Sequence, residues 1–230
     1  MSAPKKVVVL ISGRGSNLEA LLSADLPVSV ATVISNVPGV TGLAIAAARG
    51  ISTAVIDHRA YRDRESFEAA LAPHIDACGP DLVLLAGFMR VLTSRFVARY
   101  GGRMLNIHPS LLPSFPGLHT HRRALEAGVR IHGCTVHFVT PSLDGGPIVI
   151  QSAVPVLPGD DEDALAARVL AQEHRIYPQA VRWFCEDRLR LGADGAIRLD
   201  GQHGAAGALI SPALSLPSSE PSPPLGANAP

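Results

Sequence analysis

Asn106 and His108 carry the groups in this chain best placed to do chemistry. They lie two residues apart in the segment 106–113 (NIHPSLLP), which ends an apolar run and then breaks into prolines. Residues i and i+2 of a strand project to the same face, and prolines cannot continue the hydrogen-bond ladder. The pattern therefore predicts an amide and an imidazole side by side where a strand ends.

Asp144 is the third candidate, in the turn sequence LDGGP at 143–147. An amide donor, an imidazole and a carboxylate are the groups needed to stabilise an oxyanion and to move a proton. A histidine at a strand end is often only structural, and an aspartate before two glycines often only starts a turn. The chemical interpretation therefore requires folding to bring Asp144 to the other two.

A glycine-rich turn, residues 12–17 (SGRGSN), separates the first apolar run from a helical pattern that begins at Leu18. Free backbone N–H groups at the start of a helix favour an anion, most simply a phosphate. The turn lacks both the P-loop and the dinucleotide fingerprints, and the second strand ends in Ser35-Asn36 instead of an acid that could hold a ribose. A tight turn without a ligand is the alternative.

The order of the elements predicts a single three-layer α/β domain with a mostly parallel, twisted sheet. Ligands of such folds bind at the carboxyl ends of the strands. Residues 88–92 (FMRVL) follow one such end, and their apolar side chains either line a slot for a flat aromatic ligand or pack between strand and helix. We expect strands at 7–11, 28–34, 53–56, 81–87, 103–108, 133–139 and 147–156, helices at 41–49, 64–77, 120–127 and 164–183, and a short C-terminal hairpin from 188–191 and 196–199.

The bulk composition indicates a globular protein with one domain over residues 1–201 and a flexible Ala/Gly/Ser/Pro-rich tail over 202–230. The 230-residue chain is 47% hydrophobic with a formal net charge of zero, which gives no reason to expect a nucleic-acid partner. Its three cysteines form no CxxC pair and indicate reduced thiols in a cytoplasmic protein. The first apolar run is too short to cross a membrane.

Several motifs of this chain are similar to those of the glycinamide ribonucleotide formyltransferases, enzymes of purine biosynthesis that use 10-formyltetrahydrofolate. The NIHPSLLP segment is shared by the wider folate-dependent formyltransferase superfamily. The early GRGSN loop and the PGLHTH segment at 116–121 narrow the resemblance to the glycinamide enzymes. The resemblance covers about residues 6 to 200 and implies a Rossmann-like formyltransferase fold.

The resemblance also implies a role for each matching residue. Asn106, His108 and Asp144 would be catalytic, while Gly15, Ser16, Asn17 and Glu173 would bind the ribonucleotide. The folate would be bordered by Arg64, Met89, Arg90, Val91, Leu92, Asn106, Thr140 and Leu143. On the residues alone, Arg64 is equally well read as a solvated helix charge. Glu173 lies in an amphipathic helix, where a solvent-facing acid is the default, so its role rests on the resemblance.

The implied reaction is attack of the substrate amine on the formyl group at N10 of the folate. Asn106 and protonated His108 would donate to the oxyanion, and Asp144 would favour the imidazolium and assist proton transfer. We expect no metal, since His119 and His121 have poor geometry for a shared ion, and a monomer or weak homodimer. Another folate-dependent formyltransferase, a formyltetrahydrofolate hydrolase and a non-catalytic nucleotide-binding module are the alternatives.

Overall fold

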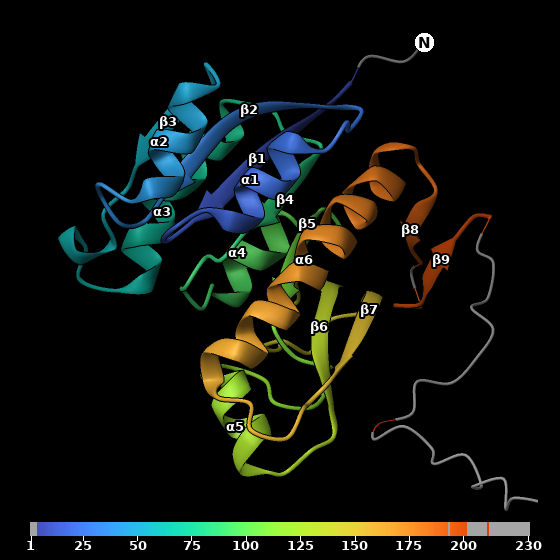
Figure 1. The fold of residues 1–230 in the computed structure, drawn as a ribbon. Coiled ribbons are helices and arrows are strands. Elements are labelled where there is room, and N and C mark those ends of the chain that lie inside the picture. Colours follow the sequence, from blue (N-terminus) through green and yellow to red (C-terminus); the bar gives the residue numbers. More distant parts are fainter. Residues whose placement is uncertain (1–3, 193, 202–210, 212–230) are drawn as a thin grey trace, which may run out of the picture.

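The fold is built on one seven-stranded sheet in the order β3-β2-β1-β4-β5-β6-β7 (Figure 1). The structure, a computed structural model, describes residues 4–192, 194–201 and 211. Strands β1 to β5 pair in parallel, whereas β6 runs antiparallel to both β5 and β7. The strands are β1 (Lys5–Ile11), β2 (Val28–Ser35), β3 (Thr53–Val55), β4 (Leu82–Leu85), β5 (Met104–His108), β6 (Ile131–Phe138) and β7 (Ile148–Pro155).

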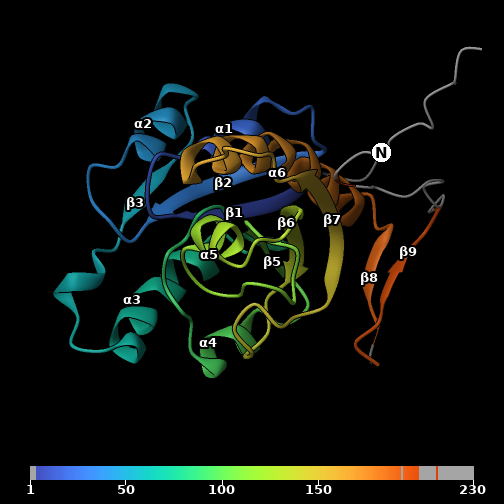
Figure 2. The same ribbon diagram turned by 60° about the horizontal axis from the view of Figure 1, so that its bottom comes forward.

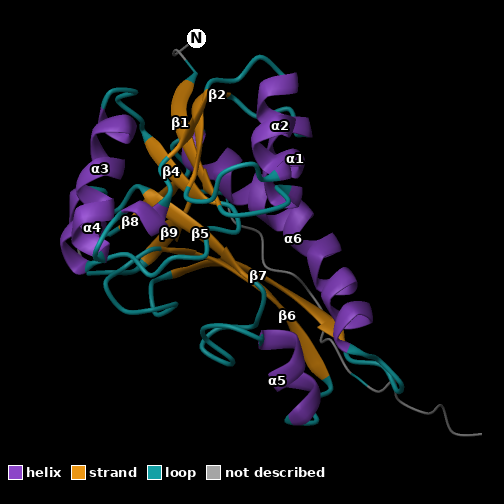
Figure 3. Ribbon diagram, turned by 90° about the vertical axis from the view of Figure 1, so that its left-hand side faces the viewer, coloured by secondary structure: helices purple, strands orange, loops and turns teal. Residues whose placement is uncertain are grey.

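Helices cover both faces of the sheet, which gives the expected three layers (Figure 3). Alternate residues of β1 point to opposite faces, so Val7 and Val9 join one apolar cluster while Val8 and Leu10 join the other. The first cluster includes side chains of α1 (Ser16–Ser23), α2 (Thr41–Ala48), α5 (Thr120–Glu126) and α6 (Glu162–Cys185), and the second those of α3 (Arg64–Asp76) and α4 (Ser94–Arg99). The expectation of a single α/β domain with a mostly parallel sheet is confirmed.

Two short elements were not expected from the sequence: α4 and the 3-10 helix η1 (His58–Ala60). Helix α4 has only six residues and begins at a cap, in which the Thr93 hydroxyl accepts the backbone N–H of Phe96. Thr93 is itself held by the buried carboxylate of Glu68 on α3, which accepts its backbone N–H at 2.7 Å. A helix this short depends on such tertiary contacts more than on its own pattern.

Helix α6 is the longest helix, and Pro178 lies inside it without ending it. The C-terminal hairpin of β8 (Leu189–Leu191) and β9 (Ile197–Leu199) is present as expected and lies at the β7 side of the molecule (Figure 2). Apart from Ser211, the expected tail at 202–230 lies outside the described residues. No helix in the described part of the chain is long and apolar enough to cross a membrane.

Candidate active site

Asn106 is fixed by a histidine on the neighbouring strand. His137 lies directly opposite Asn106 in the antiparallel β5–β6 pair, and the Asn106 Nδ2 atom is 3.1 Å from His137 Nε2. The other ring nitrogen, Nδ1, lies 3.0 Å from the carbonyl oxygen of Phe138 and donates to it. Burial lowers the pKa of His137, so the neutral ring accepts one Asn106 N–H at Nε2. The second N–H of the Asn106 amide remains free for a ligand.

His108 is nearly buried, and both of its ring nitrogens face oxygen atoms. Nδ1 is 3.5 Å from the Asp144 Oδ2 atom, and Nε2 is 3.1 Å from the carbonyl oxygen of Phe115. Only the doubly protonated ring can donate from both nitrogens. His108 therefore lies between a carboxylate and a carbonyl oxygen, and an N–H of its ring can also donate to a developing oxyanion.

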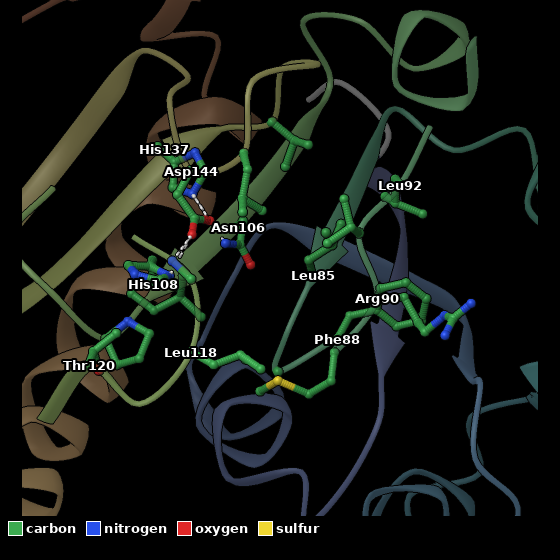
Figure 4. Close-up of a pocket in the computed structure, with 18 of the residues that line it drawn as sticks. Leu85, Phe88, Arg90, Leu92, Asn106, His108, Leu118, Thr120, His137 and Asp144 are labelled. Carbon is green, nitrogen blue, oxygen red and sulfur yellow. Dashed lines mark hydrogen bonds and ion pairs between the residues drawn. The ribbon is translucent and has the colours of Figure 1, made fainter. Parts of the chain in front are cut away.

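Asp144 reaches this histidine from the loop that follows β6. Its backbone is in the left-handed region, with φ of 49°, and its Oδ2 atom accepts the backbone N–H of Gly117 at 2.8 Å. Its other oxygen, Oδ1, is 3.9 Å from His137 Nε2. The carboxylate thus joins two loops and faces two histidines, as the sequence hypothesis requires (Figure 4).

These groups open onto a cleft of about 450 Å³. One wall is formed by residues 87–92, which follow β4, and the other by loops 117–121 and 140–144 (Figure 4). Met89, Val91, Leu118 and Leu143 are apolar side chains exposed around it. Of the predicted residues, the cleft brings together Asn106, His108, Asp144, Met89, Arg90, Val91, Leu92, Thr140 and Leu143. An apolar slot with a few polar groups at one end suits a flat aromatic ligand.

A second cluster contains the predicted phosphate loop and Glu173 of α6. The Asn17 Nδ2 atom donates to the buried Glu173 carboxylate at 2.6 Å, and burial raises the pKa of Glu173. The buried Asn17 Oδ1 atom has no hydrogen-bond partner among the residues that the structure describes. Both side chains therefore offer acceptors to the hydroxyl or amine donors of a ligand. These residues do not line the 450 Å³ cleft.

The turn before α1 depends on glycine. Gly15 has φ of +83°, and a Cβ atom there would lie 2.6 Å from the Gly42 Cα of α2. We expect Gly15→Ala to lower the free energy of unfolding by about 1–3 kcal/mol, because the strain of a positive φ adds to the clash between the new Cβ atom and the Gly42 backbone. Urea denaturation measures this, with Gly39→Ala as control, since Gly39 has φ of +70° but open space around it. Equal losses in the two variants would contradict the clash.

One residue predicted to border the folate lies outside the cleft. Arg64 is the first residue of α3, is exposed and is not among the residues that line the cleft. His121 does line it, but its ring packs edge-on against buried His132 with 5.3 Å between centroids. Within the described residues, no three His, Cys, Asp or Glu side chains are placed to hold a metal ion.

His137 is the residue of this site that the sequence interpretation missed. Thr135 and His137 repeat on β6 the i, i+2 spacing of Asn106 and His108, but only the register of β5 against β6 places His137 opposite Asn106. That register is a property of the sheet and is not visible in either strand alone.

A mostly parallel sheet with an amide, an imidazole and a carboxylate at one end of an apolar cleft is an arrangement suited to acyl-group transfer. The chain belongs to the formyl transferase family, whose sequence model matches residues 5–181.

Within that family, the chain is 50% identical over 200 residues to the phosphoribosylglycinamide formyltransferase of Escherichia coli strain K12, covering 85% of this chain and 94% of that protein. It is also 50% identical over 183 residues to the trifunctional purine biosynthetic protein adenosine-3 of Drosophila melanogaster, covering 77% of this chain but 14% of that longer protein. The crystal structure of glycinamide ribonucleotide transformylase 1 from Symbiobacterium toebii superposes with a TM-score of 0.83 at 47% identity, covering 86% and 95% of the two chains.

Proposed function

We propose that this protein transfers the formyl group of 10-formyltetrahydrofolate to the primary amine of glycinamide ribonucleotide. The observation that carries the proposal is the convergence of Asn106, His108 and Asp144 at the polar end of the cleft. The names of the relatives point to the same reaction.

The proposed chemistry begins when the neutral amine attacks the formyl carbon. A bond forms between the amine nitrogen and that carbon, and the carbonyl oxygen becomes an oxyanion. The free N–H of Asn106 and an N–H of protonated His108 would donate to this oxygen. His108 Nε2 donates to the Phe115 carbonyl, so the formyl oxygen would replace that acceptor.

Collapse of the intermediate breaks the bond between the formyl carbon and N10 of the folate. The amine must lose a proton and N10 must gain one, so the step is balanced by a single transfer. We assign this transfer to Asp144, acting through a water molecule, since its carboxylate lies beside His108 and is held by Gly117. Binding the two substrates side by side supplies much of the remaining acceleration.

The folate would lie in the cleft, with its ring system against the apolar wall of residues 88–92 and against loop 140–144. Thr140 and Leu143 of that loop border the same space, and Asn106 lies at its inner end. Arg64 is exposed at the start of α3, where a cation can attract the acidic tail of a folate. The ribonucleotide phosphate would bind the free N–H groups of Gly15, Ser16 and Asn17 at the start of α1.

Glu173→Gln is expected to stabilise the protein while weakening the ribonucleotide complex about tenfold, because a charged acceptor is lost. Burial raises the pKa of Glu173, so the unfolded state ionises first as pH rises and stability falls. Glutamine does not ionise, so it removes this loss of stability. The gain in melting temperature should therefore be larger at about pH 7.5 than at about pH 4.

Thermal unfolding at the two pH values and titration calorimetry check both parts. Glu126→Gln is the control, because Glu126 is an exposed glutamate on α5. A Glu173→Gln protein that is less stable at neutral pH, or that binds the ribonucleotide as tightly as before, would contradict the assignment.

An absorbance assay of 10-formyltetrahydrofolate conversion, run with and without glycinamide ribonucleotide, tests the function. The proposal predicts turnover that depends on the ribonucleotide. Equal turnover without it would indicate a hydrolase, turnover with a different amine only would indicate another formyltransferase, and binding without turnover would indicate a nucleotide-binding module.

A further inference from the structure

We propose that Ser12 is a positioning residue that couples the ribonucleotide and folate sites, an inference that rests on the proposed function. Ser12 directly follows β1, at the point where the strand order of the sheet reverses between β1 and β4. In doubly wound folds the crevice at this reversal is where ligands bind. Ser12 is the residue through which the two sides of that crevice are joined.

Three hydrogen bonds of Ser12 connect the two sides of the crevice. The backbone N–H of Ser12 donates to the Gly87 carbonyl at 3.1 Å, and the Ser12 Oγ atom accepts the backbone N–H of Met89 at 2.7 Å. The same hydroxyl donates to the Asn36 Oδ1 atom at 2.5 Å. The Ser12 side chain therefore holds the turn after β4, and Asn36, which follows β2, orients the Ser12 hydroxyl.

Asn36 is well suited to hold this hydroxyl in one orientation. Asn36 is 2% exposed. Its backbone carbonyl oxygen accepts the backbone N–H of His58 at 3.2 Å and lies 2.8 Å from His58 Nδ1. The sequence has Asn36 where a dinucleotide-binding fold would carry a ribose-binding acid. Here its amide oxygen faces Ser12, so the residue serves the protein's own loop instead of a ligand.

The two loops joined by Ser12 are those assigned to the two substrates. The phosphate loop begins at the next residue, Gly13. On the other side Met89 belongs to the cleft wall of residues 87–92, in which Phe88 and Arg90 are labelled in Figure 4. A phosphate that holds the loop at 13–17 in place would also hold Ser12, whose hydroxyl accepts the Met89 backbone N–H. Each ligand should therefore lower the ordering cost of the other.

Titration calorimetry with tetrahydrofolate, with and without saturating glycinamide ribonucleotide, measures this coupling. We expect the ribonucleotide to tighten tetrahydrofolate binding at least about fivefold in the unaltered protein. In Ser12→Ala the factor should fall below about two and the tetrahydrofolate Kd should rise about fivefold. Ser12→Thr, which keeps the hydroxyl, should retain most of the coupling.

Ser35→Ala is the matched control. The Ser35 hydroxyl also accepts one backbone N–H and donates to one oxygen, both of Val37, and Ser35 is the last residue of β2, directly before Asn36. The control should lose stability but keep the coupling. In the unaltered protein, amide exchange of the segment 87–92 should also slow when the ribonucleotide alone is added.

The outcomes separate the inference from the function. Four results would overturn the role of Ser12 and leave the function intact. They are binding of both ligands without coupling, a Ser12→Ala variant that keeps the coupling, an equal loss of coupling in Ser35→Ala, and unchanged amide exchange at 87–92. A protein that binds neither ligand would overturn the proposed function and this inference together.

Discussion

Replacing His108 by alanine is expected to lower kcat by about 10²–10³-fold, because one donor to the oxyanion is lost. The imidazole is nearly buried, with one nitrogen near Asp144 and the other on the Phe115 carbonyl, and alanine leaves no donor at this position. Ribonucleotide affinity should stay within about twofold, since the phosphate loop does not contact this residue. Steady-state kinetics and titration calorimetry measure the two effects separately.

His74→Ala is the control for this variant, because His74 is an exposed histidine on α3. It should leave both kcat and affinity unchanged. A His108→Ala protein with near-native kcat would exclude the histidine from the chemistry. One that has lost ribonucleotide binding as well would point to a structural role.

Asp144→Asn is expected to lower kcat by about 10²–10⁴-fold, the range for loss of proton transfer by a placed side chain. Asparagine keeps the size of the side chain and one oxygen for the Gly117 N–H. It removes the charge beside His108 and turns an amide N–H toward a ring that already needs acceptors. His108 loses the carboxylate beside its Nδ1 atom, and the amine loses its route for the proton.

Asp160→Asn is the matched control for Asp144, because Asp160 also accepts a backbone N–H in a loop, that of Leu157 at 2.7 Å, and pairs with Arg168. The Asp160→Asn variant should be less stable but should keep the native kcat. If the Asp144→Asn protein turned over at a near-native rate, its carboxylate would be no more than the anchor of the Gly117 loop.

Local patterns account for the parts of this structure that were predicted correctly. The uninterrupted apolar run at Val7–Ile11 indicated a strand covered on both faces, and the structure buries it completely. The two-residue period placed Asn106 and His108 on one face, and both line the cleft. The helix expected from residue 164 to 183 was also found, within α6.

What was missed depends on contacts between distant segments. The position of His137 depends on the register of β5 against β6, and α4 depends on the buried Glu68 carboxylate that holds Thr93. The role of Asn36 in orienting the Ser12 hydroxyl depends on the contact between these two residues, which are distant in the sequence. The approach of Asp144 to His108 came from the resemblance, since a loop separated by 36 residues has no local pattern that fixes where it returns.

Single-turnover transfer of a ¹³C-labelled formyl group, followed by NMR, tests the central claim most directly. The unaltered protein, mixed with labelled 10-formyltetrahydrofolate and glycinamide ribonucleotide, should place the label on the ribonucleotide amine within one turnover. His108→Ala, with both substrates bound, should leave it on the folate over the same time. Label appearing in free formate, or reaching the amine equally fast without His108, would contradict the account.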